Sequence, residues 1–378
     1  MGTCTIKSVR PSECEHVVVY RRDDEYAGWP FNGGLWDFGD EILVGFVRNK
    51  CAYRSPWDVQ HRRVQYVGGQ FIVIRSRDSG RSWLQDELQV VYSNKAELHA
   101  KVEYYLALGE FPRPPPVDFT SRSAAIATEP PLGSEARPPA FFVTSDKGHT
   151  WHGPYVMHVS GFRMIHARPS YIVDDEGRLL FFVQGLRDEE IVRGYAAVEP
   201  EGRPMVIVSE DGAASWRFLS YILPPNPEFP RICPAPAVLP DGRIVVALRV
   251  MGPAGVQWTE LYASEDGGLT WEFVSRVNRW GAPASLLVLR DERLLCVYGY
   301  RVPSYGIRAR ISDDGGETWG PEIVIRDDGG SWDLGYPRAT ELPDGRILTV
   351  YYFNDRDDSI RCEGGVRYIA ATIFAPPY

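Results

Sequence analysis

Five octets place aspartate, glycine and hydroxyl residues at a fixed spacing that could serve metal binding or turn formation. They follow Ser/Thr-x-Asp-x-Gly-x-Ser/Thr-Trp, except that Ala213 replaces one glycine. The octets begin at Ser76, Thr144, Ser209, Ser264 and Ser312. A calcium loop needs a longer series of oxygen ligands and a terminal glutamate, which these octets lack. We therefore expect each aspartate to accept hydrogen bonds from its own turn, and each tryptophan to fill the gap between neighbouring repeats.

Other motifs that would indicate cofactor chemistry are missing from the sequence. It contains no Gly-rich phosphate loop, no cluster of metal ligands and no Ser-His-Asp signature. We therefore predict no metal and no cofactor. The six cysteines have neither paired nor metal-ligand spacing, which is typical of free thiols in a reducing compartment.

The elements that carry these octets form a repeated pattern. The octets start 68, 65, 55 and 48 residues apart, as expected for one supersecondary unit with insertions of unequal length. Between them lies a second repeat of two apolar runs joined by a tight turn, as in 235–250 and 336–353, which predicts a hairpin. Each unit then contains four antiparallel strands, the size of one propeller blade.

Six such hairpins predict an all-β fold, a six-bladed β-propeller that forms a single domain over residues 1–378. The stretch 367–375 supplies the third strand of the last blade, and 16–22 its outer strand, so that the ring closes without an exposed edge. Residues 86–120 contain a helical period followed by a Pro-rich run. We expect a surface insertion there, a short helix with a stiff return.

Charge and hydropathy restrict the partners. The net charge of −9 argues against a nucleic-acid backbone, and no apolar run approaches the ~20 residues of a membrane span. The first 16 residues lack the apolar core of a signal peptide, so we predict a cytoplasmic protein. The sequence is compatible with a monomer and with an oligomer.

Five octets on a six-bladed pattern resemble the sialidase (neuraminidase) superfamily, whose repeats are called Asp boxes. The resemblance covers nearly the whole chain. It implies a central site in which three arginines bind the carboxylate of a sugar, a Tyr–Glu pair acts as nucleophile and base, and an aspartate acts as acid/base.

Local sequence carries four of these roles over to this chain. The resemblance implies that Tyr336, in GGSWDLGYPRAT, is the nucleophile and that Glu228, in PPNPEFPRIC, is its base. A phenol becomes a good nucleophile only when a base and cationic neighbours activate it. Arg249, in IVVALRV, and Arg308, in SYGIRARIS, resemble two of the carboxylate-binding arginines, whose planar guanidinium suits a bidentate contact.

The chain departs from the family at the third arginine. Asn32, in WPFNGG, stands where the family has that residue. Arg48, in GFVRNK, resembles a further family arginine. Arg168, in HARPS, and Arg338, in YPRAT, occupy strand entries that face the channel of a propeller, so either could replace the missing charge.

Three residues remain candidates for the acid/base. Asp58 is the only carboxylate in the loop NKCAYRSPWDVQHRR, and Asp37 lies at a strand entry in GLWDFGD. His166, in FRMIHARPS, could transfer protons near neutral pH.

These residues lead to one main functional expectation and two alternatives. The first is a sialidase-like exo-glycosidase that cleaves a terminal anionic sugar from a glycan with retention, in which Tyr336 attacks the anomeric carbon. One alternative is a glycosidase or lyase on another sugar, a uronate or deoxy sugar, with His166 and Tyr336 abstracting a proton. The other is a non-catalytic carbohydrate-binding propeller.

Overall fold

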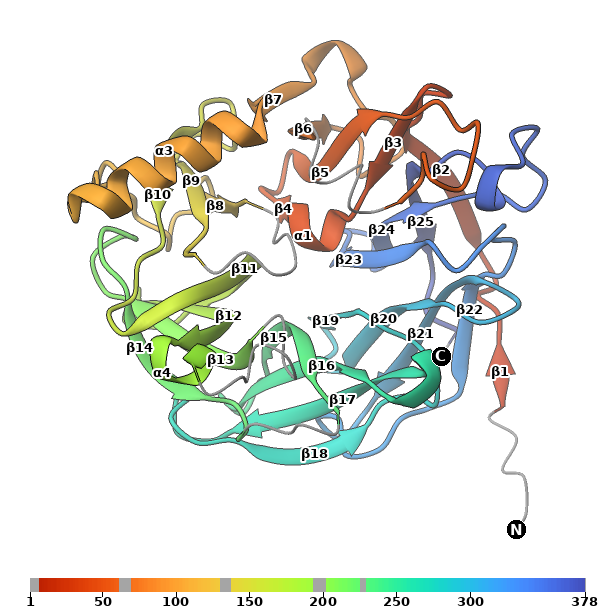
Figure 1. The fold of residues 1–378 in the computed structure, drawn as a ribbon. Helices are drawn as coiled ribbons and strands as arrows, with labels where there is room; N and C mark the ends of the chain where they lie inside the picture. The colour runs from red at the N-terminus through yellow and green to blue at the C-terminus, as the bar shows by residue number, and fades with distance from the viewer. Residues whose placement is uncertain (1–6, 61–68, 130–136, 193–201, 225–228, 378) are drawn as a thin grey trace.

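The computed structural model describes residues 7–60, 69–129, 137–192, 202–224 and 229–377, and arranges six sheets around a central axis (Figure 1). The all-β six-bladed propeller expected from the repeats is confirmed. No helix in the described ranges is long and apolar enough to cross a membrane.

The first two blades contain the irregular part of the ring. In blade 1, β3 (Glu25–Gly28) and β4 (Leu35–Asp37) both pair with β5 (Ile42–Lys50), and β6 (Gln70–Ser76) and β7 (Gln89–Tyr92) follow outward. Blade 2 has three strands in the described residues, which are β8 (Ala125–Thr128), β9 (Ala140–Thr144) and β10 (His152–Val156). The run Phe111–Val117 that precedes blade 2 contains four prolines, which lack the N–H that a central strand must donate.

Blades 3 and 4 each have four antiparallel strands in chain order from the axis outward. Blade 3 consists of β11 (Phe162–Val173), β12 (Leu179–Arg187), β13 (Arg203–Ser209) and β14 (Arg217–Tyr221). Blade 4 consists of β15 (Arg231–Val238), β16 (Ile244–Met251), β17 (Gln257–Ser264) and β18 (Glu272–Arg276).

The last two blades include the N-terminal strands. Blade 5 consists of β19 (Ala284–Val288), β20 (Leu294–Tyr300), β21 (Gly306–Ser312) and β22 (Glu322–Arg326), with β1 (Ser8–Val9) parallel to β22. Blade 6 consists of β23 (Gly335–Glu341), β24 (Ile347–Phe353) and β25 (Tyr368–Phe374), and its outer strand is β2 (Cys14–Tyr20), antiparallel to β25. The red β2 and the blue β25 lie in the same blade of Figure 1.

The octets are turns between the third and fourth strands, as expected. Asp78 shows the pattern, because its carboxylate accepts the backbone N–H of Ser82 at 2.8 Å and the hydroxyl of Ser82 at 2.6 Å. The octet tryptophans reach neighbouring blades. The Trp271 indole N–H donates to Ser220 of blade 3 at 3.1 Å, and that of Trp319 donates to Ser275 of blade 4 at 3.0 Å.

The insertion after blade 1 contains the expected helix, α3 (Lys95–Leu108). The Asn94 side chain caps its first turn, and it ends at Gly109 in a left-handed conformation with φ 69°. The buried Glu129, beside β8, accepts hydrogen bonds from His99 of α3 at 2.7 Å and from Arg137 at 2.7 and 3.1 Å. Burial alone would raise the pKa of Glu129, but these donors hold it well below its usual range, so a charged cluster anchors α3 on blade 2.

A short helix plugs the central channel. The helix α1 (Pro30–Gly33) lies between β3 and β4, near the middle of the ring in Figure 1, and it contacts β5, β11 and β23. Its Phe31 side chain is fully buried. The helix and its buried Phe31 therefore fill axial space between blades 1, 3 and 6.

Candidate active site

A repeated X-Pro dipeptide lies in or beside the axial elements of five blades. The pairs are Trp29-Pro30, Arg168-Pro169, Cys233-Pro234, Ala282-Pro283 and Tyr336-Pro337. Trp29, Cys233 and Tyr336 have φ of 62°, 58° and 50°. Large side chains rarely adopt these values, and a following proline restricts them further. Such strain persists where the surroundings impose it, and it concentrates at functional sites.

Tyr336 lies at the second position of β23, with two guanidinium groups around its ring. Its hydroxyl oxygen accepts a hydrogen bond from Arg249 Nη1 at 3.0 Å. The guanidinium carbons of Arg301 and Arg249 lie 5.2 and 5.9 Å from the ring centroid. The ring also packs against Tyr352, with centroids 5.9 Å apart, and edge-on against Phe31. Tyr336 is half-buried, so a partly exposed phenol faces positive charge.

A buried carboxylate orients Arg301. The Arg301 guanidinium donates from Nε to the Leu334 carbonyl at 3.0 Å and from Nη2 to the Tyr352 hydroxyl at 2.9 Å. Tyr352 in turn donates to Asp333 Oδ1 at 2.8 Å. The other Asp333 oxygen accepts from Tyr26 at 2.9 Å and from Arg367 Nε at 3.0 Å.

The environment of Asp333 keeps its tyrosine neighbours protonated. Asp333 is 3% exposed. Burial first, and then the negative charge of Asp333, raises the pKa of both Tyr26 and Tyr352 well above the ordinary value. Both phenols therefore remain hydrogen-bond donors, and the Tyr352 oxygen remains available to Arg301.

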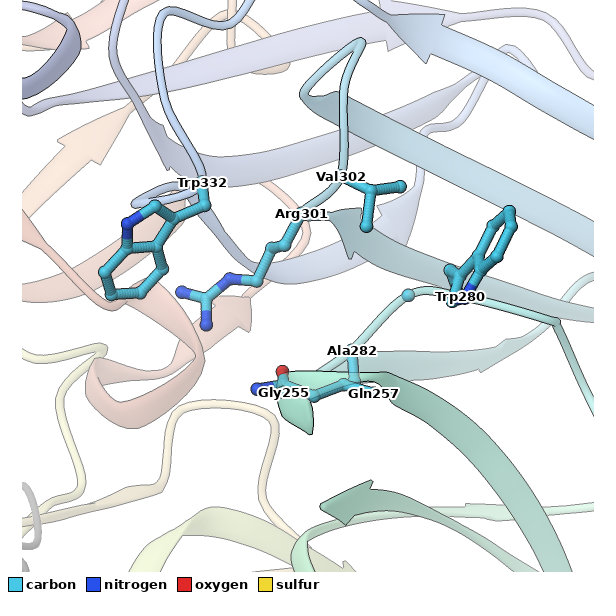
Figure 2. A pocket seen from close by; sticks show the side chains of 8 residues that line it. Gly255, Gln257, Trp280, Ala282, Arg301, Val302 and Trp332 are labelled. Atoms are coloured by element: carbon cyan, nitrogen blue, oxygen red, sulfur yellow. The ribbon is translucent and has the colours of Figure 1, made fainter. Parts of the chain in front are cut away.

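A pocket opens beside Arg301 (Figure 2). Its volume is about 140 Å³. It is lined by Gly255, Gln257, Trp280, Gly281, Ala282, Arg301, Val302 and Trp332. The Trp332 side chain is 50% exposed, and the Arg301 guanidinium carbon lies 5.5 Å from its ring centroid. The pocket thus continues the positive surface at Tyr336 toward two tryptophans.

Arg338 and Arg168 hold the channel plug in place. Arg338 donates to the Phe31 carbonyl at 2.8 and 3.2 Å and to the Pro169 carbonyl at 2.9 Å. Burial, followed by the nearby charge of Arg168, lowers the pKa of Arg338 to about 9, although Tyr171 acts in the opposite direction. The Arg338 donors are thus directed at backbone oxygens of α1 and β11.

Asn32 is part of the same plug. It is 3% exposed, and its side-chain oxygen accepts from Arg168 Nε at 3.1 Å. Arg168 Nη1 also donates to Gln184 Oε1 at 2.5 Å. Asn32 therefore fixes the position of Arg168 inside the channel.

Arg48 and Arg308 lie outside the contacts of Tyr336 in the described chain. Arg48 donates to the Tyr20 hydroxyl at 2.6 Å and lies 3.8 Å from Glu25. Arg308, on β21, pairs with Glu322 at 2.9 Å. Arg48 thus links blade 1 to β2 of blade 6, and Arg308 links two neighbouring strands of blade 5.

The three acid/base candidates occupy different places. Asp37 accepts a hydrogen bond from Thr340 at 3.2 Å. Thr340 lies four residues beyond Tyr336 on β23, roughly 13 Å along the strand, so Asp37 is at the opposite, octet end of the channel. Asp58 caps its own loop by accepting from the Arg54 N–H at 2.8 Å. His166 is 3% exposed on β11.

Glu228 lies outside the described residues. Among the residues that the structure does describe, the Tyr336 hydroxyl has one hydrogen-bond partner, Arg249. No cluster of three or more His, Cys, Asp or Glu side chains able to hold a metal ion occurs in this part of the chain.

Sequence reasoning missed Arg301, Asp333, Tyr352 and Trp332. The sequence contains a signal for three of them. Arg301 directly follows the apolar run of β20, as Arg48 and Arg249 lie near the ends of the corresponding runs. Trp332 and Asp333 stand in SWDLGYP, immediately before Tyr336.

The six blades and five octets define this molecule as an Asp-box propeller. The chain matches the model of the BNR repeat-like domain over residues 133–350, more than half its length, and it belongs to that family. A search of the curated proteins gave no match.

Solved structures share the fold. A protein of unknown function from Dyadobacter fermentans superposes with a TM-score of 0.71 at 23% identity, over 97% of this chain and 98% of that chain. The Trypanosoma rangeli sialidase in complex with sialic acid gives 0.59 at 13% identity, and the match covers 97% of this chain and 59% of the sialidase. The Penicillium chrysogenum alpha-L-arabinanase complexed with arabinobiose gives 0.59 at 13% identity, over 94% and 97%.

Proposed function

We propose that this chain is a glycoside hydrolase that acts on a terminal sugar bearing a carboxylate, with Tyr336 as its nucleophile. The observation that carries the proposal is the Tyr336 hydroxyl, which accepts a hydrogen bond from Arg249 while Arg301 lies beside the same ring. Two guanidinium groups can bind an anionic sugar and stabilise a phenolate. Tyrosine suits such a substrate, because a carboxylate nucleophile would repel it.

The proposed reaction proceeds in two displacements. The Tyr336 oxygen bonds to the anomeric carbon as the bond to the leaving oxygen breaks, and the phenol proton passes to a base, for which Glu228 is the sequence candidate. An acid, for which Asp58 is the candidate, protonates the leaving oxygen. Water then attacks the same carbon and gives its proton to that acid/base, while the bond to the Tyr336 oxygen breaks and the base returns its proton to the phenolate. The sugar therefore keeps its configuration.

The fold comparisons support the broad class. A sialidase and an alpha-L-arabinanase, two enzymes named for glycoside cleavage, share this propeller. Because one fold hosts several activities, the argument for an anionic sugar rests on the two arginines and not on the fold.

The test compares hydrolysis of fluorogenic sialic acid and glucuronic acid glycosides by the wild type and by Tyr336→Phe. We expect release of one of them by the wild type, and a loss of about 10³-fold or more in kcat for Tyr336→Phe. Tyr104→Phe, at an exposed tyrosine of α3, is the matched control and should keep full activity. Equal activity of Tyr336→Phe and the wild type would reject Tyr336 as the nucleophile.

A carbohydrate-binding propeller without turnover is the second candidate. The observation that favours it is that, in the described chain, the Tyr336 hydroxyl bonds an arginine and no carboxylate. Saturable binding of the free sugar acid, with no hydrolysis of either glycoside, would support this candidate over the hydrolase.

A further inference from the structure

The strand β2 forms the outer edge of blade 6, and its far side has no neighbouring strand in the described chain. It has seven residues, whereas the outer strands of blades 1 to 4 (β7, β10, β14 and β18) have four or five. In blade 5 the corresponding edge, on β22, is covered by β1. Among the described outer strands, β2 therefore presents the longest edge that no strand of this chain covers.

The pairing of β2 with β25 determines which backbone groups point outward. The Ala375 N–H donates to the Glu13 carbonyl at 3.4 Å, so alternate residues from Glu13 onward direct their polar groups toward β25. The N–H and C=O groups of Cys14, His16 and Val18 therefore point away from the sheet. No backbone group in the described residues bonds them, so three consecutive outward positions have donors and acceptors available to another strand.

The composition of β2 does little to prevent such pairing. Edge strands are commonly protected by lysine, by proline or by a covering element. The sequence CEHVVVY contains no lysine, arginine or proline, and the Val18 side chain is 57% exposed. The regular edge ends at a bulge after Val18, where the Gln85 side chain covers the Val19 carbonyl. The open segment is thus residues 14–18.

These outward residues are complementary to themselves in one antiparallel register. When His16 lies opposite His16 of a second copy, Cys14 of each copy lies opposite Val18 of the other, so all three positions are paired. Two hydrogen bonds for each of the three pairs give six in all, related by a twofold axis. The exposed Val18 then contacts a cysteine, and Glu15 lies opposite Val17 and not opposite its own counterpart.

His16 does not oppose this register near neutral pH. Burial first, and then the charge of Arg326, lowers the pKa of His16 from its ordinary value of 6.5, although Asp328 acts in the opposite direction. The two imidazoles that face each other across the twofold axis are therefore neutral at pH 7, and no like charges lie directly opposite one another.

We propose that the edge of β2 is a homodimer interface, in which two copies pair antiparallel through residues 14–18 and join their sixth blades into one continuous sheet. The register selects a second copy of this chain as the occupant, because each outward donor meets an acceptor of the same segment. The contact is small beside the roughly 1,600 Å² of a standard interface, so the dimer is weak and forms at high protein concentration. It does not depend on the proposed function.

The test measures the oligomeric state of the whole chain. Sedimentation velocity over a concentration series up to roughly 500 µM, at pH 7, should show a monomer–dimer equilibrium for the wild type. Val18→Pro removes an N–H that points outward, so the pairing with β25 keeps its hydrogen bonds, and dimerisation should weaken at least about tenfold. Val18→Thr keeps the N–H and the β-branched shape, and as the matched control it should dimerise within about threefold of the wild type.

Residue-resolved hydrogen exchange of the wild type guards against misfolding of Val18→Pro. The amides of Cys14, His16 and Val18 should exchange more slowly at the high end of the series than at the low end. Those of Glu15 and Val17, which point toward β25, should not change. A wild type that stays monomeric throughout, or Val18→Pro that dimerises as the wild type does, would overturn the interface. A dimer in which the three outward amides gain no protection would overturn it as well, because the contact would then lie elsewhere.

Discussion

At the scale of single residues, the candidate site depends on which groups each nearby arginine contacts. Arg338 and Arg168 donate into the channel plug, and Arg308 is paired with Glu322. Arg249 and Arg301 instead flank Tyr336. The positive charge near Tyr336 therefore depends on which arginines contact that residue, and not on how many arginines lie near the axis.

Tyr352 tests whether the orientation of Arg301 matters. Tyr352→Phe removes the hydroxyl that links Arg301 to Asp333 but keeps the ring that packs against Tyr336. We expect the free energy of unfolding to fall by about 1–3 kcal/mol. The affinity for a sugar acid should fall several-fold, because Arg301 loses its fixed direction. Thermal unfolding and calorimetric titration measure the two effects.

Tyr351→Phe is the matched control for this prediction. Tyr351 is the neighbour of Tyr352 on β24, and its hydroxyl bonds Thr372 inside the blade. Its loss should lower stability comparably while leaving the affinity for the sugar acid unchanged. Equal affinities of Tyr352→Phe and Tyr351→Phe would show that the link from Asp333 to Arg301 does not position the guanidinium.

At the scale of elements, the aspartates of the octets stabilise the turn between the two outer strands of blades 1 to 5. The pKa of all five octet aspartates lies below its ordinary value of 3.8. In Asp266 the hydrogen bond from the Thr270 hydroxyl, followed by that from the Thr270 N–H, lowers the pKa to about 2. In the other four, partial burial raises the pKa, but hydrogen bonds within the octet outweigh it.

This shift predicts a pH window for stability. A carboxylate whose pKa is lower in the folded state contributes its full stabilisation above the unfolded pKa, near 3.8, and loses it as the pH falls toward 2. We expect the melting temperature to drop between about pH 4 and pH 2, and to drop less in Asp266→Asn. Scanning calorimetry across this range, at constant ionic strength, measures the effect.

Glu265→Gln is the control, because it changes the net charge equally and removes none of the hydrogen bonds of the octet. If Glu265→Gln and Asp266→Asn flatten the pH dependence to the same degree, net charge and not the octet turn would explain it.

The elements were predictable from the sequence, because their signals are local. The octets, the Asp-Gly turns and the helical period of 95–108 each lie within one stretch of chain. In the part of the chain that the structure describes, blade 2 has no strand inside β8, which the prolines near 112–116 explain and a count of hairpins ignores.

The site was less predictable, because its contacts join distant stretches. The local motifs HARPS and YPRAT do not predict that Arg168 and Arg338 donate hydrogen bonds to the helix α1, at residues 30–33. Likewise, the orientation of the Arg301 guanidinium depends on Tyr352 and Asp333, which lie 51 and 32 residues further along the chain. Side-chain partners of this kind depend on how distant strands pack together in the ring.

At the scale of the whole molecule, the stability of the ring depends on the strand that joins the last blade to the first. The strand β2 pairs with β25 and covers an edge that would otherwise be free to pair with another chain. Val19 and Tyr20 of β2 are buried in the core shared by blades 1 and 6, and Tyr20 also accepts a hydrogen bond from Arg48 of blade 1. One strand thus joins the last blade to the first.

Deletion of residues 1–20 should therefore destabilise the entire ring. Burial of Val19 and Tyr20 alone contributes about 1.5–3 kcal/mol each, a large part of a typical stability of about 5–15 kcal/mol. We expect the midpoint of urea unfolding to fall markedly and size-exclusion chromatography to show aggregates paired through β25. Deletion of residues 1–10 removes only β1, a two-residue strand on the outer edge of blade 5, and should change the midpoint little. Equal midpoints for the two deletions would mean that the blades hold the ring through their inner strands and the α1 plug, and that β2 only covers an edge.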